Sequence, residues 1–173
     1  MKNPLTSLHE ALAYELEGLY DAEKRLQKAM PILSHKVTIP ALQAEITHYG
    51  EQASDKRTKL KRAFSYLGIG PFGRKNRIMH DFLKELSELC ENTAADRIRD
   101  AMAIAGLKNI SQYKVADYST ALGFSIALEL DTVSDLLHEI ITWEKKTTDA
   151  IEELRMAQLS AKSGTLAASP AAK

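Results

Sequence analysis

The sequence contains a single cysteine, Cys90, among its 173 residues. One cysteine cannot form an internal disulfide framework and suits a reducing compartment, so we expect the protein in the cytoplasm. No apolar run approaches the roughly 20 residues of a membrane-spanning helix. The segment from Met1 to Leu8 also lacks the hydrophobic region of a signal peptide. These absences argue against a secreted protein and a membrane protein.

A net charge is missing as well, because 23 basic and 23 acidic residues cancel. Without an overall positive field we expect no nucleic acid partner. The sequence has no Gly-rich phosphate loop, nucleophile elbow or zinc motif, so the common catalytic signatures give no enzyme class. Its length fits one domain with a substantial core.

Helical periodicity dominates the chain, and no segment alternates as a strand would. A capping box of Ser7 and Glu10 starts the first long helix, whose apolar stripe runs to Leu33. Pro31 should kink or end this helix. These signals predict a first helix of about 27 residues.

The remaining helices follow from turn residues and caps. A second long helix begins at Pro40 and ends at the Gly68 break, and a short amphipathic helix follows over residues 79–90. Two further long helices, the second ending near Arg155, begin at predicted caps: Asn92 or Thr93, and Asp131 or Thr132.

Four long helices with short connections indicate an all-α, up-down four-helix bundle, with an additional short helix between the second and third long helices. The predicted bundle domain covers residues 1–157. From 158 to 173 the chain is rich in Ser, Gly, Ala and Lys without periodicity, so we expect a flexible low-complexity tail.

Two glutamates interrupt the apolar stripes of the first and last long helices, and they are the candidate functional residues. Glu23 and Glu144 both occupy positions that should face the bundle interior. A carboxylate there must be paired, protonated or bound to metal, because an isolated buried charge is too costly. Acid/base chemistry between the two carboxylates is a further alternative.

The first interpretation is structural: a buried hydrogen-bonded pair or salt bridge. Its candidate cationic partners are Lys56, Lys114 and Arg25. Tyrosine hydroxyls could also donate to the carboxylates or shield them. The candidates are Tyr20, Tyr49, Tyr113 and Tyr118.

The second interpretation is a metal site, because ferritin-like bundles hold metals with one Glu from each of two helices and a Glu-x-x-His pair from each of the others. Such a site would bind iron or another divalent metal through Glu23, Glu51 and Glu144, with His48 behind the ligands. Helical projection nevertheless points Glu51 toward solvent. The expected partner positions hold Ser54, Ser111 and Thr147, which are neither carboxylates nor histidines.

Several motifs along residues 5–155 resemble the YciF-type bacterial stress proteins, a ferritin-like family. The opening match is Leu19-Tyr20-Asp21-Ala22-Glu23-Lys24-Arg25-Leu26. The further matches are His48 with Glu51, Met79, Arg99-Asp100-Ala101, Tyr113 with Ala116, Tyr118 and Thr120, Leu136-Leu137, and Glu144-Lys145.

The resemblance implies a fold close to rubrerythrin-like di-iron proteins, a homodimer with the short helix near its interface, and expression linked to stress. The chain departs from the family pattern at three places. Ser111-Gln112 stands where the family has a Glu-His pair, and Thr142-Trp143-Glu144 stands where it has three glutamates. Asn76 stands where the family has a cysteine. We therefore expect a dimeric, non-catalytic protein with a degenerate di-iron site. The alternative is a di-iron or mononuclear metal protein that handles oxygen or peroxide.

Overall fold

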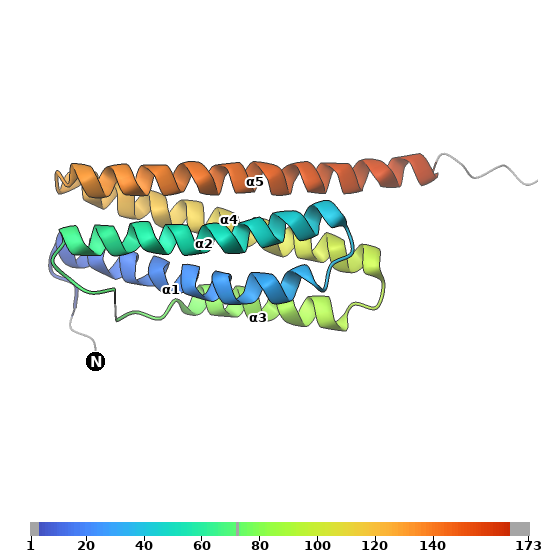
Figure 1. Cartoon of the computed structure of the whole chain (residues 1–173), viewed down its shortest axis with the longest axis horizontal. Helices are drawn as coiled ribbons and strands as arrows, with labels where there is room; N and C mark the ends of the chain where they lie inside the picture. Colours follow the sequence, from blue (N-terminus) through green and yellow to red (C-terminus); the bar gives the residue numbers. More distant parts are fainter. Residues whose placement is uncertain (1–3, 72, 167–173) are drawn as a thin grey trace, which may run out of the picture.

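The computed structural model describes residues 4–71 and 73–166, and it places no strand among them. The described residues form five helices: α1 (Leu8–Ser34), α2 (Pro40–Tyr66), α3 (Arg77–Asn92), α4 (Asp96–Ala127) and α5 (Asp131–Leu166). Figure 1 shows the four long helices side by side, with the short α3 beside α1. The predicted all-α fold with an extra short helix is confirmed. No helix in the described ranges is long and apolar enough to cross a membrane.

The long helices form a closed ring of neighbours. α1 packs against α2 and α4, while α5 packs against α4 and α2, so α2 and α4 lie on opposite sides of the bundle. The loop after α2 and the helix α3 carry the chain back along α1, and α2 and α4 therefore run in the same direction (Figure 1). One long crossover of this kind is typical of ferritin-like bundles.

Local sequence explains how the first helix begins and ends. The predicted capping box is present, because Glu10 N–H donates to the Ser7 hydroxyl and the Glu10 carboxylate accepts from Ser7 N–H. Pro31 lies inside α1, which continues to Ser34. The proline cannot donate to the carbonyl of Gln27 one turn earlier, and the helix ends three residues after it.

Two predicted helix limits are wrong. Asn92 and Thr93 belong to the end of α3, and α4 begins at Asp96 after Ala95, whose side chain offers no cap hydrogen bond. The Asp96 carboxylate in the first turn instead favours this end electrostatically. α5 extends beyond Arg155 to include 158–166, and no proline interrupts this segment. The rest of the predicted tail, 167–173, lies outside the described residues.

Two apolar clusters form the core, and together they determine where a polar site can lie. One cluster gathers around Leu26, Ile46 and Ile104, and the other around Leu16, Phe64 and Leu137. Glu23 belongs to neither cluster, although it follows Leu19 of one and precedes Leu26 of the other along α1. A polar layer therefore separates the two halves of the hydrophobic core.

The packing of α1 on α2 depends on a glycine. A Cβ added at Gly50 would lie 2.8 Å from the Cβ of Met30, and neither atom can rotate away. We expect Gly50→Ala to lower the free energy of unfolding by about 1–3 kcal/mol through overpacking, although alanine favours a helix more than glycine does. Chemical denaturation measures this loss. Gly18→Ala is the control, because its methyl group would meet the movable guanidinium of Arg74; equal losses would contradict the explanation.

Candidate functional site

Four charged side chains meet in the middle of the bundle, one from each long helix. They are Glu23 on α1, Lys56 on α2, Lys114 on α4 and Glu144 on α5, and all four are fully buried. We call this group the buried charge network. Buried charges of this kind require close partners, because removing them from water costs several kcal/mol per ion.

Lys114 joins the two glutamates. Its Nζ lies 2.7 Å from Oε1 of Glu23 and 2.5 Å from Oε1 of Glu144. These contacts are ion pairs whose angles fall outside hydrogen-bonding geometry. The Nζ of Lys56 donates to the same Glu144 oxygen at 2.5 Å and to Oε1 of Gln52 at 3.0 Å. Two ammonium groups and two carboxylates thus give the network a net charge of zero.

Two buried tyrosines complete the network. The Tyr49 hydroxyl donates to Oε2 of Glu144 at 3.0 Å, and the Tyr118 hydroxyl donates to Oε1 of Glu23 at 2.7 Å. The ring centroid of Tyr49 also lies 4.7 Å from Nζ of Lys114 and 5.2 Å from Nζ of Lys56. The tyrosines therefore offer hydrogen bonds to the carboxylates, and Tyr49 offers an aromatic face to the cations.

Burial and the neighbouring charges shift the pKa values of Glu144, both lysines and both tyrosines. Burial raises the pKa of the Glu144 carboxyl, but Lys114 and Lys56 outweigh it and hold that pKa below its ordinary value. Burial lowers the pKa of Lys114, but Glu144 and Glu23 outweigh it and raise that pKa. The pKa of Lys56 is lowered, first by burial and then by the neighbouring Lys114. Burial, followed by the nearby carboxylates, raises the pKa values of Tyr49 and Tyr118. The interior thus favours ionised Glu144 and Lys114 at neutral pH.

This pairing predicts acid sensitivity. Because the folded-state pKa of Glu144 lies below its unfolded value, its contribution to stability is present above the unfolded pKa and is lost as pH falls through the folded pKa. We expect the free energy of unfolding to decrease between about pH 5 and pH 2. Denaturation of wild type and Glu144→Gln across this range tests the assignment. An identical pH dependence in both proteins would contradict it.

Three other candidate partners lie elsewhere. Arg25 pairs with Asp21 on its own helix, at 2.6 Å between Nε and Oδ2. The hydroxyl of Tyr20 accepts a hydrogen bond from Arg57, and Tyr113 exchanges hydrogen bonds with the side chain of Asn76. Of the seven partners that the sequence suggested, the structure brings four to the glutamates, namely Lys56, Lys114, Tyr49 and Tyr118.

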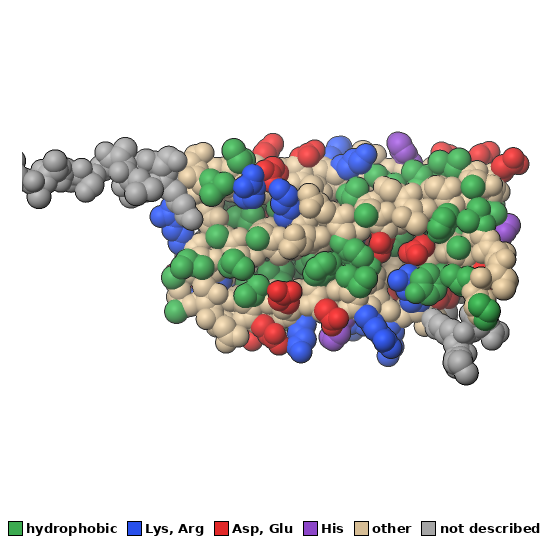
Figure 2. All heavy atoms as spheres, turned by 180° about the vertical axis from the view of Figure 1, so that it is seen from behind, with side chains coloured by type: hydrophobic (Ala, Val, Ile, Leu, Met, Phe, Trp, Pro, Cys, Tyr) green, Lys and Arg blue, Asp and Glu red, His purple; other side chains and the backbone are tan. Residues whose placement is uncertain are grey.

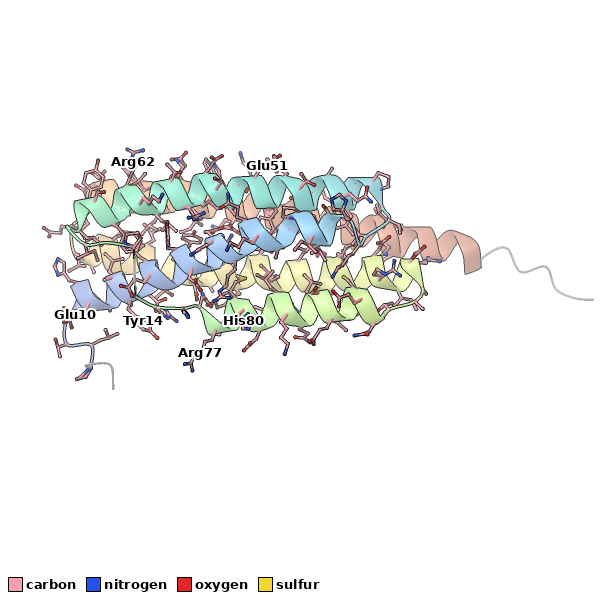
Figure 3. The ribbon with its side chains drawn as sticks, turned by 60° about the horizontal axis from the view of Figure 1, so that its bottom comes forward. Glu10, Tyr14, Glu51, Arg62, Arg77 and His80 are labelled. Carbon is pink, nitrogen blue, oxygen red and sulfur yellow. The ribbon has the colours of Figure 1, made fainter. Side chains whose placement is uncertain are left out.

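Glu51 does not join Glu23 and Glu144. It is exposed on the outer side of α2, as helical projection predicts (Figure 3). Ser54 is exposed as well. The two α2 residues with the same spacing that face the bundle interior are Ala53 and Lys56, two residues further along the helix. The sequence interpretation of Glu51 and Ser54 as the equivalent of a Glu-x-x-His pair is therefore wrong in register.

Sequence reasoning gave too little weight to two members of the site. Lys114 lies three residues after Ser111 and four before Tyr118, so the helical period alone places it on the buried face of α4. Gln52 is half-buried and links Lys56 to Thr147, whose hydroxyl lies 3.4 Å from the same Gln52 oxygen. The helical period does not predict the contact of Gln52 with Thr147, because it depends on how α2 and α5 cross.

The donor set does not fit a di-iron centre. A ferritin-like centre uses carboxylates and histidines from all four helices, whereas here α2 and α4 contribute ammonium groups. An ammonium has no lone pair for a metal, and it already contacts the glutamate oxygens that would bind one. Across the part of the chain that the structure describes, no group of three or more His, Cys, Asp or Glu residues is placed to hold a metal ion.

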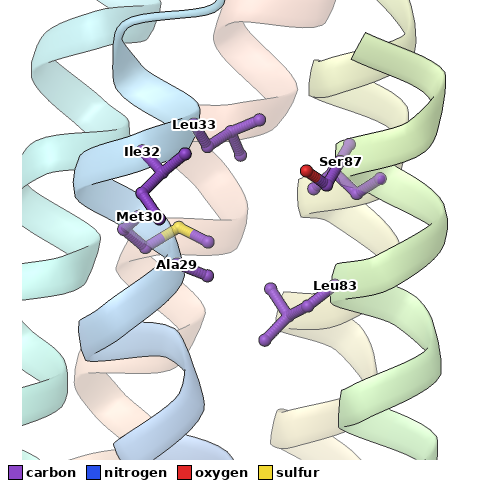
Figure 4. Close-up of a pocket in the computed structure, with 7 residues that line it drawn as sticks. Ala29, Met30, Ile32, Leu33, Leu83 and Ser87 are labelled. Carbon is purple, nitrogen blue, oxygen red and sulfur yellow. The ribbon is translucent and has the colours of Figure 1, made fainter. Parts of the chain in front are cut away.

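A small apolar cavity of about 60 Å³ lies away from the network, between α1 and α3 (Figure 4). Ala29, Met30 and Leu33 line it from α1, and Leu83 and Ser87 line it from α3. Its volume and almost wholly apolar lining offer no group for acid/base chemistry. This cavity is therefore not a candidate catalytic site.

Comparisons with known proteins agree with this geometry. A bundle with one long crossover defines a ferritin-like helical protein. Residues 7–163 match the family described as a domain of unknown function (DUF892), and the chain belongs to that family. It is 21% identical over 159 residues to protein YciF of Escherichia coli strain K12, covering 91% of this chain and 96% of that protein. The recognition of a YciF-type protein from sequence motifs is confirmed.

Solved structures support the same fold. The crystal structure of the E. coli stress protein YciF superposes with a TM-score of 0.87 at 21% identity, covering 90% of this chain and 99% of that one. YcfI from Rhodopseudomonas palustris gives a TM-score of 0.84 at 22% identity, covering 88% of this chain and 97% of that one. A protein from Xanthomonas campestris gives a TM-score of 0.72 at 14% identity, covering 92% of this chain and 98% of that one.

Proposed function

We propose that this chain is a dimeric, stress-associated and non-catalytic YciF-type protein, in which an internal salt-bridge network takes the place of a di-iron site. The association with stress is taken from the E. coli relative, which is described as a stress protein. The cytoplasm is the proposed compartment, because the only cysteine, Cys90, is buried and free.

One observation carries the proposal: the ammonium of Lys114 lies between Glu23 and Glu144, within 2.7 Å of both. A cation at that place neutralises the two carboxylates as a metal ion would, but it is covalently part of α4 and cannot be lost. All four charges of the network are also fully buried, so a substrate would have to open the bundle to reach them.

A metal-binding function is the second candidate, because Oε2 of Glu23 is buried and has no hydrogen-bond partner. A free carboxylate oxygen in an apolar interior could ligate a cation. In that case the protein would handle oxygen or peroxide through a mononuclear or dinuclear centre that includes Glu23 and Glu144.

Iron titration under anaerobic conditions separates the two functions. Protein purified without chelator is analysed for metals and then titrated with Fe²⁺, alongside Glu23→Ala. The structural function predicts less than about 0.1 iron per chain and identical titrations of both proteins. Stoichiometric iron in wild type that is lost in Glu23→Ala would overturn it. Glu51→Ala serves as a control, because Glu51 is exposed and distant from the network.

A further inference from the structure

A methionine sulfur lines the small cavity between α1 and α3. Met30 belongs to α1, and none of its surface is exposed, but it is one of the residues around this cavity of about 60 Å³. Figure 4 shows its thioether directed from α1 toward α3, on the side of Ala29 and Leu83. Met79 and Cys90, which belong to the same apolar cluster, are not among the lining residues. The cavity therefore distinguishes one buried sulfur atom from the others in this cluster.

The cavity reaches the molecular surface. Ile32 lines it and is 61% exposed, while the lining residues Ala29, Leu83 and Ser87 are half-buried. A water molecule needs a cavity of about 10–15 Å³, so hydrogen peroxide, with two oxygen atoms, needs roughly 20–30 Å³. The volume of about 60 Å³ is therefore sufficient for one peroxide molecule beside the Met30 sulfur. A small oxidant can approach this thioether while the bundle stays folded.

The stem of Met30 is fixed on its other side by α2. A Cβ added at Gly50 would lie 2.8 Å from Cβ and 3.5 Å from Cγ of Met30, so the backbone of α2 passes directly against the first two carbons of this side chain. Because α2 closes that side, the free space next to the sulfur lies toward α3. An oxygen atom added to the sulfur would therefore lie in the cavity.

We infer that Met30 is a site of oxidation by small peroxides, and that its sulfoxide loosens the packing of α3 on α1. A lone pair of the sulfur attacks one oxygen of hydrogen peroxide, and the S–O bond forms as the O–O bond breaks. The departing hydroxide takes the proton of the transferred oxygen and becomes water. The sulfur loses two electrons and the peroxide gains them. Methionine sulfoxide reductases reverse this change, so the modification acts as a switch.

The sulfoxide oxygen would lack a free hydrogen-bond donor in the cavity. Among the residues that line it, Ser87 alone has a polar side chain. That hydroxyl already accepts a hydrogen bond from Nζ of Lys36 at 2.8 Å and donates to Oε1 of Glu91 at 3.2 Å. A strongly polar S=O group in an apolar site is costly without a donor, so oxidation favours states in which water enters the cavity.

The helix α3 is the wall of the cavity that can move. It packs chiefly against α1 and α4, and its fully buried side chains are Met79, Leu86 and Cys90. Figure 2 shows acidic and basic side chains along the lower edge of the molecule, where α3 lies. The exposed charged residues of this helix are Arg77, Asp81, Lys84, Glu85, Glu88 and Glu91. A single apolar face therefore holds α3, and water in the cavity weakens that face directly.

Peptide mapping by mass spectrometry, during treatment of the native protein with hydrogen peroxide, tests access to the sulfur. Exposed Met102 and Met156 should oxidise first and serve as internal references. We expect Met30 to oxidise at least about 10-fold faster than Met79, which is equally buried but does not line the cavity. Equal rates for Met30 and Met79 would mean that both react only on unfolding, and would overturn the inference.

Ala29→Val tests the cavity as the route of the oxidant. The substitution adds two methyl groups to the cavity lining and should slow the oxidation of Met30 by about 10-fold. The oxidation of Met102 and Met156 should be unchanged, because both lie at the exposed surface. An unchanged rate at Met30 in the folded variant would overturn this route. The comparison of Met30 with Met79 in wild type does not depend on this variant.

Hydrogen exchange of the α3 amides tests the consequence of oxidation. After peroxide treatment we expect the amides of residues 77–92 to exchange at least about 10-fold faster, and a methionine sulfoxide reductase to restore slow exchange. Met30→Leu is the control, because it keeps the volume of the side chain but has no sulfur. Unchanged exchange in wild type with oxidised Met30, or equal acceleration in treated Met30→Leu, would overturn the switch. Neither result touches the iron titration.

Discussion

Lys114→Met is expected to lower the free energy of unfolding by about 3–5 kcal/mol. The substitution keeps the volume and the apolar stem of Lys114 but removes the cation that contacts both glutamates. Glu23 would then keep a single polar contact, the hydroxyl of Tyr118. A buried carboxylate without a counter-ion is far more costly than the intact pair, so the variant should unfold at a lower denaturant concentration.

The control for this prediction is Lys108→Met on the same helix. Lys108 forms an ion pair with Glu152, but both side chains are about one-third exposed. Its loss should cost less than about 1 kcal/mol, because solvent already screens the pair. Adding Glu23→Gln to Lys114→Met should recover part of the lost stability, since it removes the uncompensated charge. Equal losses for the two lysine variants would contradict the role of the buried charge network.

Glu144→Gln should have an effect of similar size, about 3–5 kcal/mol, for the opposite reason. Glu144 forms ion pairs with both ammonium groups, so its neutral isostere would leave Lys56 without an anionic partner and would leave two buried cations close together. Equilibrium denaturation at pH 7 measures the loss. Glu139→Gln is the control, because Glu139 pairs with Lys59 at the exposed surface.

The pH dependence of Glu144→Gln provides a sharper test. The pKa of Lys56 is already lowered by burial and by Lys114, and losing Glu144 should lower it further. A lysine whose folded-state pKa lies below its unfolded value destabilises the fold while it is charged, so stability rises as pH passes through the folded pKa. We therefore expect the deficit of Glu144→Gln to shrink as pH rises toward the ordinary lysine pKa of about 10. A constant deficit would show that Lys56 remains charged without its partner.

The fold was predictable because each long helix carries its own apolar period, and the first two carry clear start signals. The capping box at Ser7, the proline at Pro40 and the apolar stripes determine which faces are buried, and the structure agrees. The start of α4 was not predictable from caps, because Ala95 makes no side-chain cap hydrogen bond while Thr93 looks like a good cap in sequence. The continuation of α5 past Arg155 was missed because the Ser, Gly and Thr residues of 158–166 suggested a tail.

The site was predictable in part. The period located Glu23, Glu144 and Lys56 in the interior, and the need to compensate buried charge indicated lysines and tyrosines as partners. The choice among these partners depends on tertiary packing. Arg25 has an acidic neighbour one turn away, and this local pair at 2.6 Å keeps it from the interior. The contacts of Lys114 with both glutamates depend on how α1, α4 and α5 approach one another, which no single period specifies.

Under the proposed function, the two lysines compensate the buried acids in place of a metal. Its inward positions follow the ferritin-like plan closely, with Glu23 on α1, Ala53 and Lys56 on α2, Lys114 on α4, and Glu144 and Thr147 on α5. The plan requires a carboxylate or histidine at each of these places. Four substitutions would convert the inward residues of this bundle into the ligand set of the ferritin-like plan.

The central claim, that lysines replace the metals of this bundle, is tested most directly by measuring iron stoichiometry in wild type and in a variant that restores the ferritin-like donors. The variant combines Ala53→Glu, Lys56→His, Lys114→Glu and Thr147→His, and iron per chain is measured after anaerobic loading and gel filtration. We predict about two iron ions per chain for the variant and none for wild type. Stoichiometric iron in the wild-type protein, held through Glu23, would contradict the claim.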